Sequence, residues 1–254
     1  MTDGVTPSTE DQIIHAETHI ERTFSGYPDK ARLQRAMSSS GWKKELWALA
    51  DRLGFDPSDV LQWFRHELYG KFLGFDCPDL TGLVVPAYRR GFNNVLPIVA
   101  VHGQYPNEAV FQAIKRQLGS KGLGAWKWTD GVLDEAIAHN DRDPLKGAYA
   151  VRTRGRVEAD KELRDLSANV LAERQIPTET VYEYQIEFAA YYARTGKFLD
   201  PKDTSTLLAG SRTVDGDVPN GDWSPDDRKF CLGYWCSPSS SYDGLRGRQV
   251  EVSI

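Results

Sequence analysis

Cys231 and Cys236 are the residues whose type most readily points to chemistry in this 254-residue sequence. Zinc and redox sites commonly use a Cys-x-x-Cys pair, and a structural zinc site needs a second pair of ligands. The two cysteines lie five residues apart, and no second ligand pair is near them in the sequence. Cys77 has no histidine neighbour that would make it a nucleophile. An odd total of three cysteines also argues against a disulfide framework.

Three other patterns are close to functional motifs, but each lacks an essential part. His15 and His19 share a helix face, without the His-Glu-x-x-His order of a zinc hydrolase. Asp141-Arg142-Asp143 lacks the glycine and the distal glutamate of a calcium loop. The glycines within 119–124 follow no clear strand, as a dinucleotide site would require. We therefore expect no catalytic residues, no metal and no cofactor, and we predict that the protein is not an enzyme.

The most distinctive segment is Ala209–Arg248, in which aromatic residues are interleaved with small polar ones. Its 40 residues include six Gly, six Ser and six Asp, with one Lys and no Glu. This composition is usual in loops. It is also typical of binding surfaces, where Tyr and Trp provide contact area and small polar residues provide adaptable hydrogen bonds. Arg212, Arg246 and Arg248 lie at the margins, where we expect them to brace loop carbonyls or carboxylates.

Two stretches of this segment carry a resemblance to a known family. Gly233–Arg248 has a Trp-Cys-Ser-Pro-Ser run, further small polar residues and an Arg-Gly near the chain end. Ala209–Trp223 has Ala-Gly-Ser-Arg, then Asp-Gly, Val-Pro and Trp. Both stretches resemble the variable proteins of diversity-generating retroelements, and the similarity covers roughly residues 122–254.

The resemblance implies a C-type-lectin fold for residues 122–254, with a variable region at about 209–248. It also implies that a reverse transcriptase element acts on the gene, not on the protein, and changes codons at adenines. Side chains on a face that packs against nothing can vary without creating cavities or overpacking. The expected ligand-binding face consists of Asp217, Asn220, Asp222, Cys231, Gly233, Trp235, Cys236, Ser237, Ser239, Ser240, Tyr242, Asp243 and Gly244.

The expected function is therefore ligand binding and display. The ligand is an unidentified protein or other macromolecule, and the N-terminal region would position the binding domain or form a homo-oligomer. If Phe230–Trp235 is a strand, its alternate residues face opposite sides. Phe230, Leu232 and Tyr234 would then belong to the core, and Cys231, Gly233 and Trp235 would be displayed. A one-residue change of register would exchange the two sets.

The elements that must position this face give an α+β chain, with a mostly helical region over residues 1–121 and a mixed region over 122–254. Apolar spacing and end signals predict helices at 12–23, 42–53, 57–72, 107–118, 130–139 and 179–195. Strands are expected at 126–128 and 148–154, and residues 97–101 are expected to form a strand or a buried segment. Residues 156–174 are helix-prone. After Gly196 we expect short strands separated by long ordered loops.

Two other functions stay open. The spacing within 42–71 fits a helix-turn-helix DNA-binding regulator, in which Arg65, His66 and Lys71 would approach phosphates. Asp51, Asp56, Asp59 and Glu67 oppose this function, because phosphate attraction dominates such binding. The second alternative is an oxidase of the formylglycine-generating type, which shares the lectin-like scaffold and uses cysteines.

Net charge and hydropathy exclude some broad classes. A formal net charge of -5 does not favour general binding to nucleic acid or membranes. No apolar run is long enough to span a bilayer, and the polar start is unlike a secretory signal. We therefore expect a cytoplasmic protein or one that is assembled into a particle.

Overall fold

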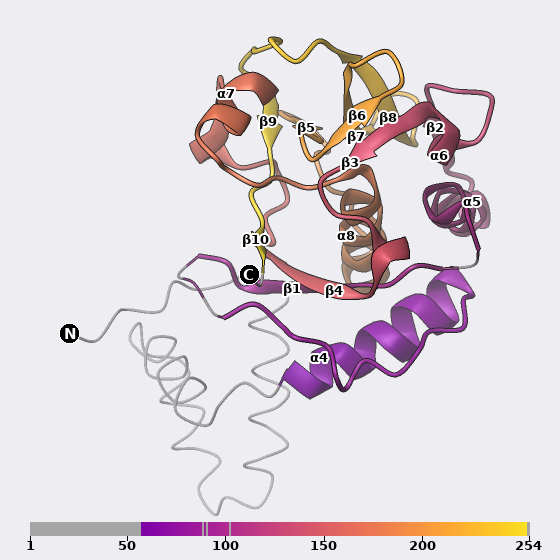
Figure 1. Cartoon of the computed structure of the whole chain (residues 1–254). Coiled ribbons are helices and arrows are strands. Elements are labelled where there is room, and N and C mark those ends of the chain that lie inside the picture. The colour runs from indigo at the N-terminus through magenta and orange to yellow at the C-terminus, as the bar shows by residue number, and fades with distance from the viewer. Residues whose placement is uncertain (1–56, 88, 90, 102, 253–254) are drawn as a thin grey trace, which may run out of the picture.

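The structure, a computed structural model, describes residues 57–87, 89, 91–101 and 103–252 (Figure 1). The helices expected at 12–23 and 42–53 lie outside these residues, as do His15, His19, Asp51 and Asp56. Within the described residues, helices combine with mixed and antiparallel sheets, so the chain is α+β as predicted.

Helix α8 (Val181–Thr195) is the central element of the fold and confirms the helix expected at 179–195. Thr180 and Glu183 form a capping box: the Glu183 amide donates to Thr180 Oγ1, and the Thr180 amide donates to Glu183 Oε2 at 2.8 Å. Gly196 ends the helix with a φ of 67°, which glycine adopts without strain. All residues from 181 to 190 are buried, so protein surrounds this part of the helix.

The first sheet is antiparallel and has the order β1-β4-β10, with β1 at Asn94–Ile98, β4 at Tyr149–Thr153 and β10 at Glu251–Val252. Helix α4 (Pro57–Trp63) and its π-helical continuation η1 (Phe64–Leu73) run beneath it in Figure 1. Tyr69 of η1 donates to Pro97 O at 2.9 Å, and Tyr182 of α8 donates to Val99 O at 2.6 Å. The strand expected at 148–154 is confirmed, whereas at 97–101 the strand lies a few residues earlier.

The second sheet has the order β2-β8-β7-β5-β9. Its strands are β2 (Gly124–Lys127), β8 (Lys229–Cys236), β7 (Val218–Ser224), β5 (Ser205–Leu207) and β9 (Leu245–Gly247). The β2–β8 and β5–β9 pairs are parallel, and the others are antiparallel. Two further short strands, β3 (Ile137–Asn140) and β6 (Ser211–Thr213), pair with each other. Short strands after Gly196 are confirmed.

The other elements are α5 (Pro106–Gly119), α6 (Leu133–Ala136), α7 (Ala168–Glu173), and the single turns η2 (Pro144–Lys146) and η3 (Lys161–Leu163). α5 confirms the helix expected at 107–118. The helix expected at 130–139 is wrong beyond Ala136, because the chain then pairs with β6.

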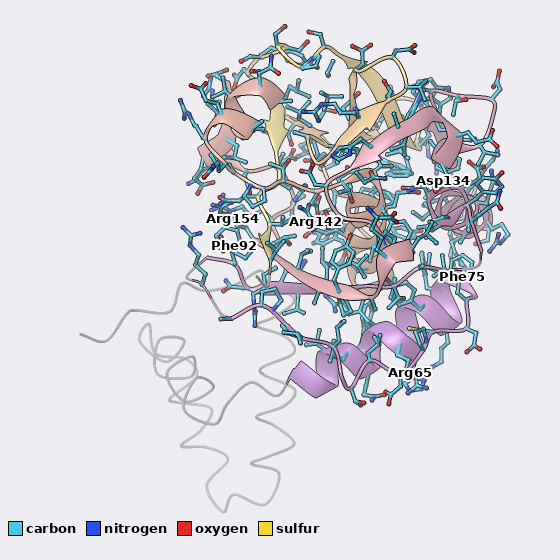
Figure 2. The ribbon with its side chains drawn as sticks, viewed as in Figure 1. Arg65, Phe75, Phe92, Asp134, Arg142 and Arg154 are labelled. Carbon is cyan, nitrogen blue, oxygen red and sulfur yellow. The ribbon has the colours of Figure 1, made fainter. Side chains whose placement is uncertain are left out.

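Residues 156–174 are only partly helical. There, Asp160 pairs with Arg154 and accepts from Gln249 N at 2.8 Å, and Arg154 also lies over the Phe92 ring (Figure 2).

The main core of the described residues joins α8 to both sheets. The Phe230 ring lies 4.2 Å from that of Phe188 and 6.1 Å from that of Tyr184, measured between centroids. A smaller core contains Leu163, Ala168, Leu171, Leu207, Val218, Cys236 and Leu245. The main core includes residues from both sides of the expected boundary at 121 and 122. The division into two domains stays a prediction.

Candidate functional site

The second sheet has one face toward α8 and one face away from it. α8 contacts the sheet at Gly221, where an added Cβ would lie 2.2 Å from the Tyr184 ring. Phe230 and Leu232 are fully buried on the same side, which confirms them as core residues. The strand register places alternate residues on the opposite side. Leu207 and Leu245 are on this side too, but they are buried in the smaller core. We call the rest of this side the outer face, and it consists of Trp126, Ser205, Asn220, Asp222 and Cys231.

Cys236 is buried, contrary to the expectation that it is displayed. Val218 lies opposite Cys236 and Asn220 lies opposite Gly233, so β8 has one extra residue in this interval. The extra residue brings Cys236 against Val218, where the smaller core covers both. Cys236 is 1% exposed, and Gly233 is buried as well. The side chains of Tyr234 and Trp235 are outside those that the structure describes.

The loop 237–244 joins the end of β8 to the start of β9. Ser237, Ser239, Tyr242 and Asp243 are exposed, and Ser240 and Gly244 are half-buried. The loop is nevertheless fixed to the rest of the protein at several points. Pro238 O accepts from Asn169 N at 2.9 Å, Gly244 O accepts from Ser205 N at 2.7 Å, and the Ser241 hydroxyl donates to Asp165 O at 2.7 Å. The loop therefore combines exposed side chains with a backbone that is anchored at two points. Some of these side chains have partners, since Ser237 bonds Ser239 and Ser240, and Asp243 pairs with Arg164 and Arg246.

Three arginines brace this region, as the sequence predicted. Arg212 donates to Ala209 O and Ser211 O, both at 2.7 Å, and Arg246 donates to Asp243 O at 3.0 Å. Arg248 is fully buried and donates to Arg156 O at 2.7 Å, Val157 O at 2.8 Å, Thr206 Oγ1 at 2.9 Å and Asp200 Oδ1 at 3.0 Å. A buried guanidinium whose donors are satisfied in this way costs little, and it holds three separate segments together.

The polar residues of β7 are half-buried. Asn220 Nδ2 donates to Ser205 Oγ at 2.8 Å, while its buried Oδ1 has no hydrogen-bond partner among the described residues. Burial raises the pKa of Asp222, and a hydrogen bond with Ser205 opposes that rise. Asp217 is also half-buried, near the start of the strand. Asp217, Asn220 and Asp222 belong to the ligand-binding face expected from the sequence, and that role stays a prediction.

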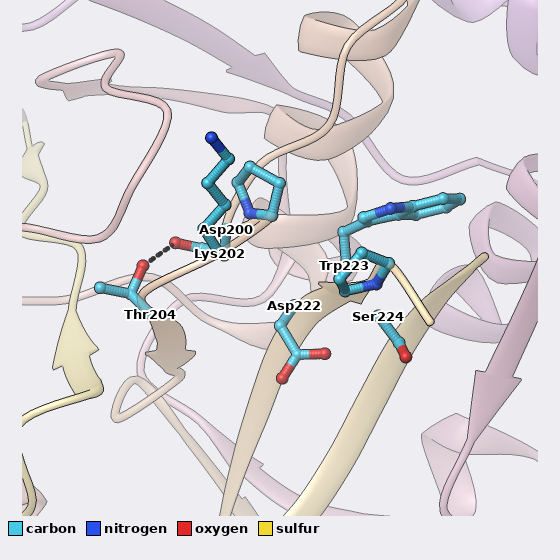
Figure 3. Close-up of a pocket in the computed structure, with 8 residues that line it drawn as sticks. Asp200, Lys202, Thr204, Asp222, Trp223 and Ser224 are labelled. Atoms are coloured by element: carbon cyan, nitrogen blue, oxygen red, sulfur yellow. Dashed lines mark hydrogen bonds between the residues drawn. The ribbon is translucent and has the colours of Figure 1, made fainter. Parts of the chain in front are cut away.

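Next to Asp222 lies an open polar hollow of about 260 Å³ (Figure 3). It is lined by Asp200, Pro201, Lys202, Thr204, Asp222, Trp223, Ser224 and Pro225. Thr204 Oγ1 donates to Asp200 Oδ1 at 2.6 Å across one wall, and in Figure 3 Lys202 and Asp222 point toward opposite ends. The hollow widens the polar surface beside the outer face.

Burial disfavours the reactive thiolate form of all three cysteines. All three are free, and burial, followed by the nearby charge of Asp222, raises the pKa of Cys231 to about 11. The Cys231 thiol therefore stays protonated at neutral pH, where a thiolate would be needed for nucleophilic attack. Over residues 57–252, apart from 88, 90 and 102, no group of three His, Cys, Asp or Glu side chains could hold a metal ion.

The most unusual charged group is Glu179, which lies just before α8. It is fully buried, and among the described residues no donor faces its ionised carboxylate, although a protonated Glu179 can hydrogen-bond Glu187. Burial first, and then the charge of Glu187, raises its pKa well above the usual range for glutamate. Glu183 nearby is instead neutralised by Arg142 at 2.6 Å. Glu179 is completely inaccessible to solvent, so we assign it to the protein interior, where burial favours its protonated form.

Two of the three basic residues that the helix-turn-helix hypothesis assigns to phosphate contacts form ion pairs within the protein. Arg65 pairs with Asp79 at 3.4 Å, and Lys71 pairs with Glu67 at 2.6 Å. His66 is exposed and shares a hydrogen bond with Gln62 at 3.0 Å. The first helix of that motif lies outside the described residues, so DNA binding stays an alternative hypothesis.

No protein family, curated protein or solved structure was found to match this chain. None of the described helices has the length and apolar character needed to cross a membrane. Trp126 also lies on the outer face, although the expected binding face did not include it. Its strand was predicted, but only the parallel pairing of β2 with β8 places it opposite Cys231.

Proposed function

We propose that this protein binds a macromolecular ligand through the outer face and the 237–244 loop, and that it is not an enzyme. The observation that carries the proposal is the combination of exposed side chains and a fixed backbone in this loop. A preformed surface loses little conformational freedom on binding, so more of the contact energy becomes affinity. Tyr242, 54% exposed, provides an aromatic contact with few rotatable bonds.

We further propose that the C-terminal part has a C-type-lectin-like fold and that its residues are diversified through a retroelement. The family resemblance of Gly233–Arg248 supports this, and so does the arrangement of the loop. Replacing Ser237, Ser239 or Asp243 creates no cavity, because none of them contributes to a hydrophobic core. The N-terminal region would position this surface, and a homo-oligomer would add avidity to weak single sites.

A pair of randomised libraries tests the proposal. The first varies Ser237, Ser239, Ser240, Tyr242 and Asp243, and the matched control varies the exposed positions Ala138, His139, Asp141, Leu145 and Lys146. Both are displayed on phage and selected against hen lysozyme, with thermal melting of random members as the folding control. We expect most members of both libraries to fold, with specific binders enriched from the first library alone. Equal enrichment from both, or general unfolding of the first, contradicts the proposal.

The neighbouring DNA tests the diversification part separately. We expect a reverse transcriptase gene and a near-copy of the DNA that encodes the variable region, with differences mainly at adenines. Their absence from the genome would remove diversification from the proposal and leave the binding surface.

A further inference from the structure

Asp222 is a partly buried carboxylate that lacks a counter-ion. None of the Arg, Lys and His residues in the described part of the chain forms an ion pair with it, and its hydrogen-bond partner is the neutral Ser205. Burying an ionised carboxylate without a paired cation lowers the stability of the folded protein. Burial accordingly raises the pKa of Asp222. A cation brought by a ligand would relieve this cost.

Trp126 lies on the same side of the sheet, two strands away. The register places Trp126 opposite Cys231, and Cys231 opposite Asp222. Neighbouring strands are about 4.8 Å apart, so the backbones of Trp126 and Asp222 are separated by about 10 Å. Trp126 is 38% exposed, which is unusual for so large an apolar side chain within a strand. Between the two lies only the small thiol of Cys231.

Tyr242 provides a second aromatic group close to this row. Burial and Cys236 raise the pKa of Tyr242 most, and the charge of Asp222 adds to that rise. Asp222 also raises the pKa of Cys231, after burial. Electrostatic effects weaken with distance. The effect of Asp222 on both Cys231 and Tyr242 is therefore expected if the three side chains share one face.

The stretch of chain that carries Asp222 is acidic, while Lys202 lines the adjoining hollow without pairing with Asp222. Between Arg212 and Arg228 the chain has five Asp and no Lys, Arg or Glu. The exposed Arg228 comes next, and Lys229 after it is paired with Asp227 at 3.0 Å. A surface of this sign favours a positively charged ligand and disfavours nucleic acid.

We propose that the row Trp126–Cys231–Asp222 binds a basic side chain of a protein ligand, with the cation between the indole ring and the carboxylate. This inference rests on the proposed binding function and specifies its ligand as a basic segment of protein. Arginine fits better than lysine, because a planar guanidinium can stack on the indole and bond the carboxylate with two N–H groups. Trp126 lies outside the segment expected to vary, so it provides a constant contact beside the variable ones.

Titration of the full chain with N-acetyl-arginine amide tests this site, with N-acetyl-citrulline amide as the uncharged control. The indole N–H signal of Trp126, assigned with Trp126→Phe, reports binding by NMR. We expect a saturable shift with the arginine compound alone. Asp222→Asn should weaken binding about tenfold or more. Trp126→Ala should weaken it about two- to fivefold, followed through the Cys231 amide.

Two matched variants, Asp215→Asn and Tyr105→Ala, replace an exposed carboxylate and an exposed aromatic elsewhere and should leave binding unchanged. Circular dichroism confirms that each variant is folded. Equal shifts with arginine and citrulline, or unaltered affinity in Asp222→Asn, overturn the cation site. Such a result leaves the proposed function intact if the loop library still yields binders. If the arginine compound binds but the loop library yields no binders, the cation site stands and the proposed function of the loop is contradicted.

Discussion

Adjacent residues of β8 should respond very differently to the same truncation. Phe230 is 0% exposed and packs against the rings of Phe188, Tyr184 and Phe111. Replacing it with Ala removes most of a fully buried ring and leaves a cavity, which costs about 3–5 kcal/mol. Cys231, its neighbour, is half-buried on the outer face. Cys231→Ala removes one partly exposed atom, so the loss should be under about 1 kcal/mol.

Urea denaturation measures both free energies of unfolding. With a slope of about 2–3 kcal/mol per molar urea, Phe230→Ala should lower the midpoint by more than about 1 M at an unchanged slope. Cys231→Ala should shift it by less than about 0.5 M. Equal losses for the two variants would refute the alternation of core and displayed residues along β8. A larger loss for Cys231→Ala would mean that the strand faces the other way.

Two further predictions concern the interior. Gly221→Ala places a Cβ 2.2 Å from the Tyr184 ring and should cost more than about 2 kcal/mol, whereas Gly119→Ala, with open space around its Cβ, should be neutral or slightly stabilising in thermal melts. Because the folded-state pKa of Glu179 is raised, stability is greatest below the pKa of the unfolded chain and falls as pH rises toward the folded-state pKa. Glu179→Gln should therefore stabilise the protein increasingly above about pH 5, by up to about 1.4 kcal/mol per pH unit, while the exposed control Glu173→Gln should show no such trend in urea titrations at several pH values.

The elements that were predicted well from the sequence are those whose ends and contacts depend on residues close together in the chain. α8 has a capping residue at Thr180, apolar residues at helical spacing and a glycine after its last turn, so neighbours in sequence determine both of its ends. The bracing by Arg246 is similarly local, because its acceptor Asp243 is three residues away. Alternation in β8 was also predictable as far as Leu232, since strand geometry fixes it.

The predictions that failed depend on contacts between distant residues. The burial of Cys236 follows from an extra residue in β8 and from a core supplied by α7 and η3. The placement of Trp126 on the outer face, which was not predicted, follows from parallel pairing with a strand about a hundred residues later. His139 was expected in a helix but pairs with Arg212 of β6, because tertiary pairing overrides local preference. No local pattern indicates these partners.

Backbone hydrogen exchange gives the most direct test of the central claim, that the loop keeps its shape whichever side chains it carries. The informative amides are Asn169, which donates to Pro238 O, and Ser205, which donates to Gly244 O. We compare the parent with a variant in which Ser237, Ser239, Ser240, Tyr242 and Asp243 are all replaced. Unchanged protection of both amides is the predicted result, because neither bond involves a replaced side chain. Loss of protection at both amides in a variant that is otherwise folded would contradict the claim.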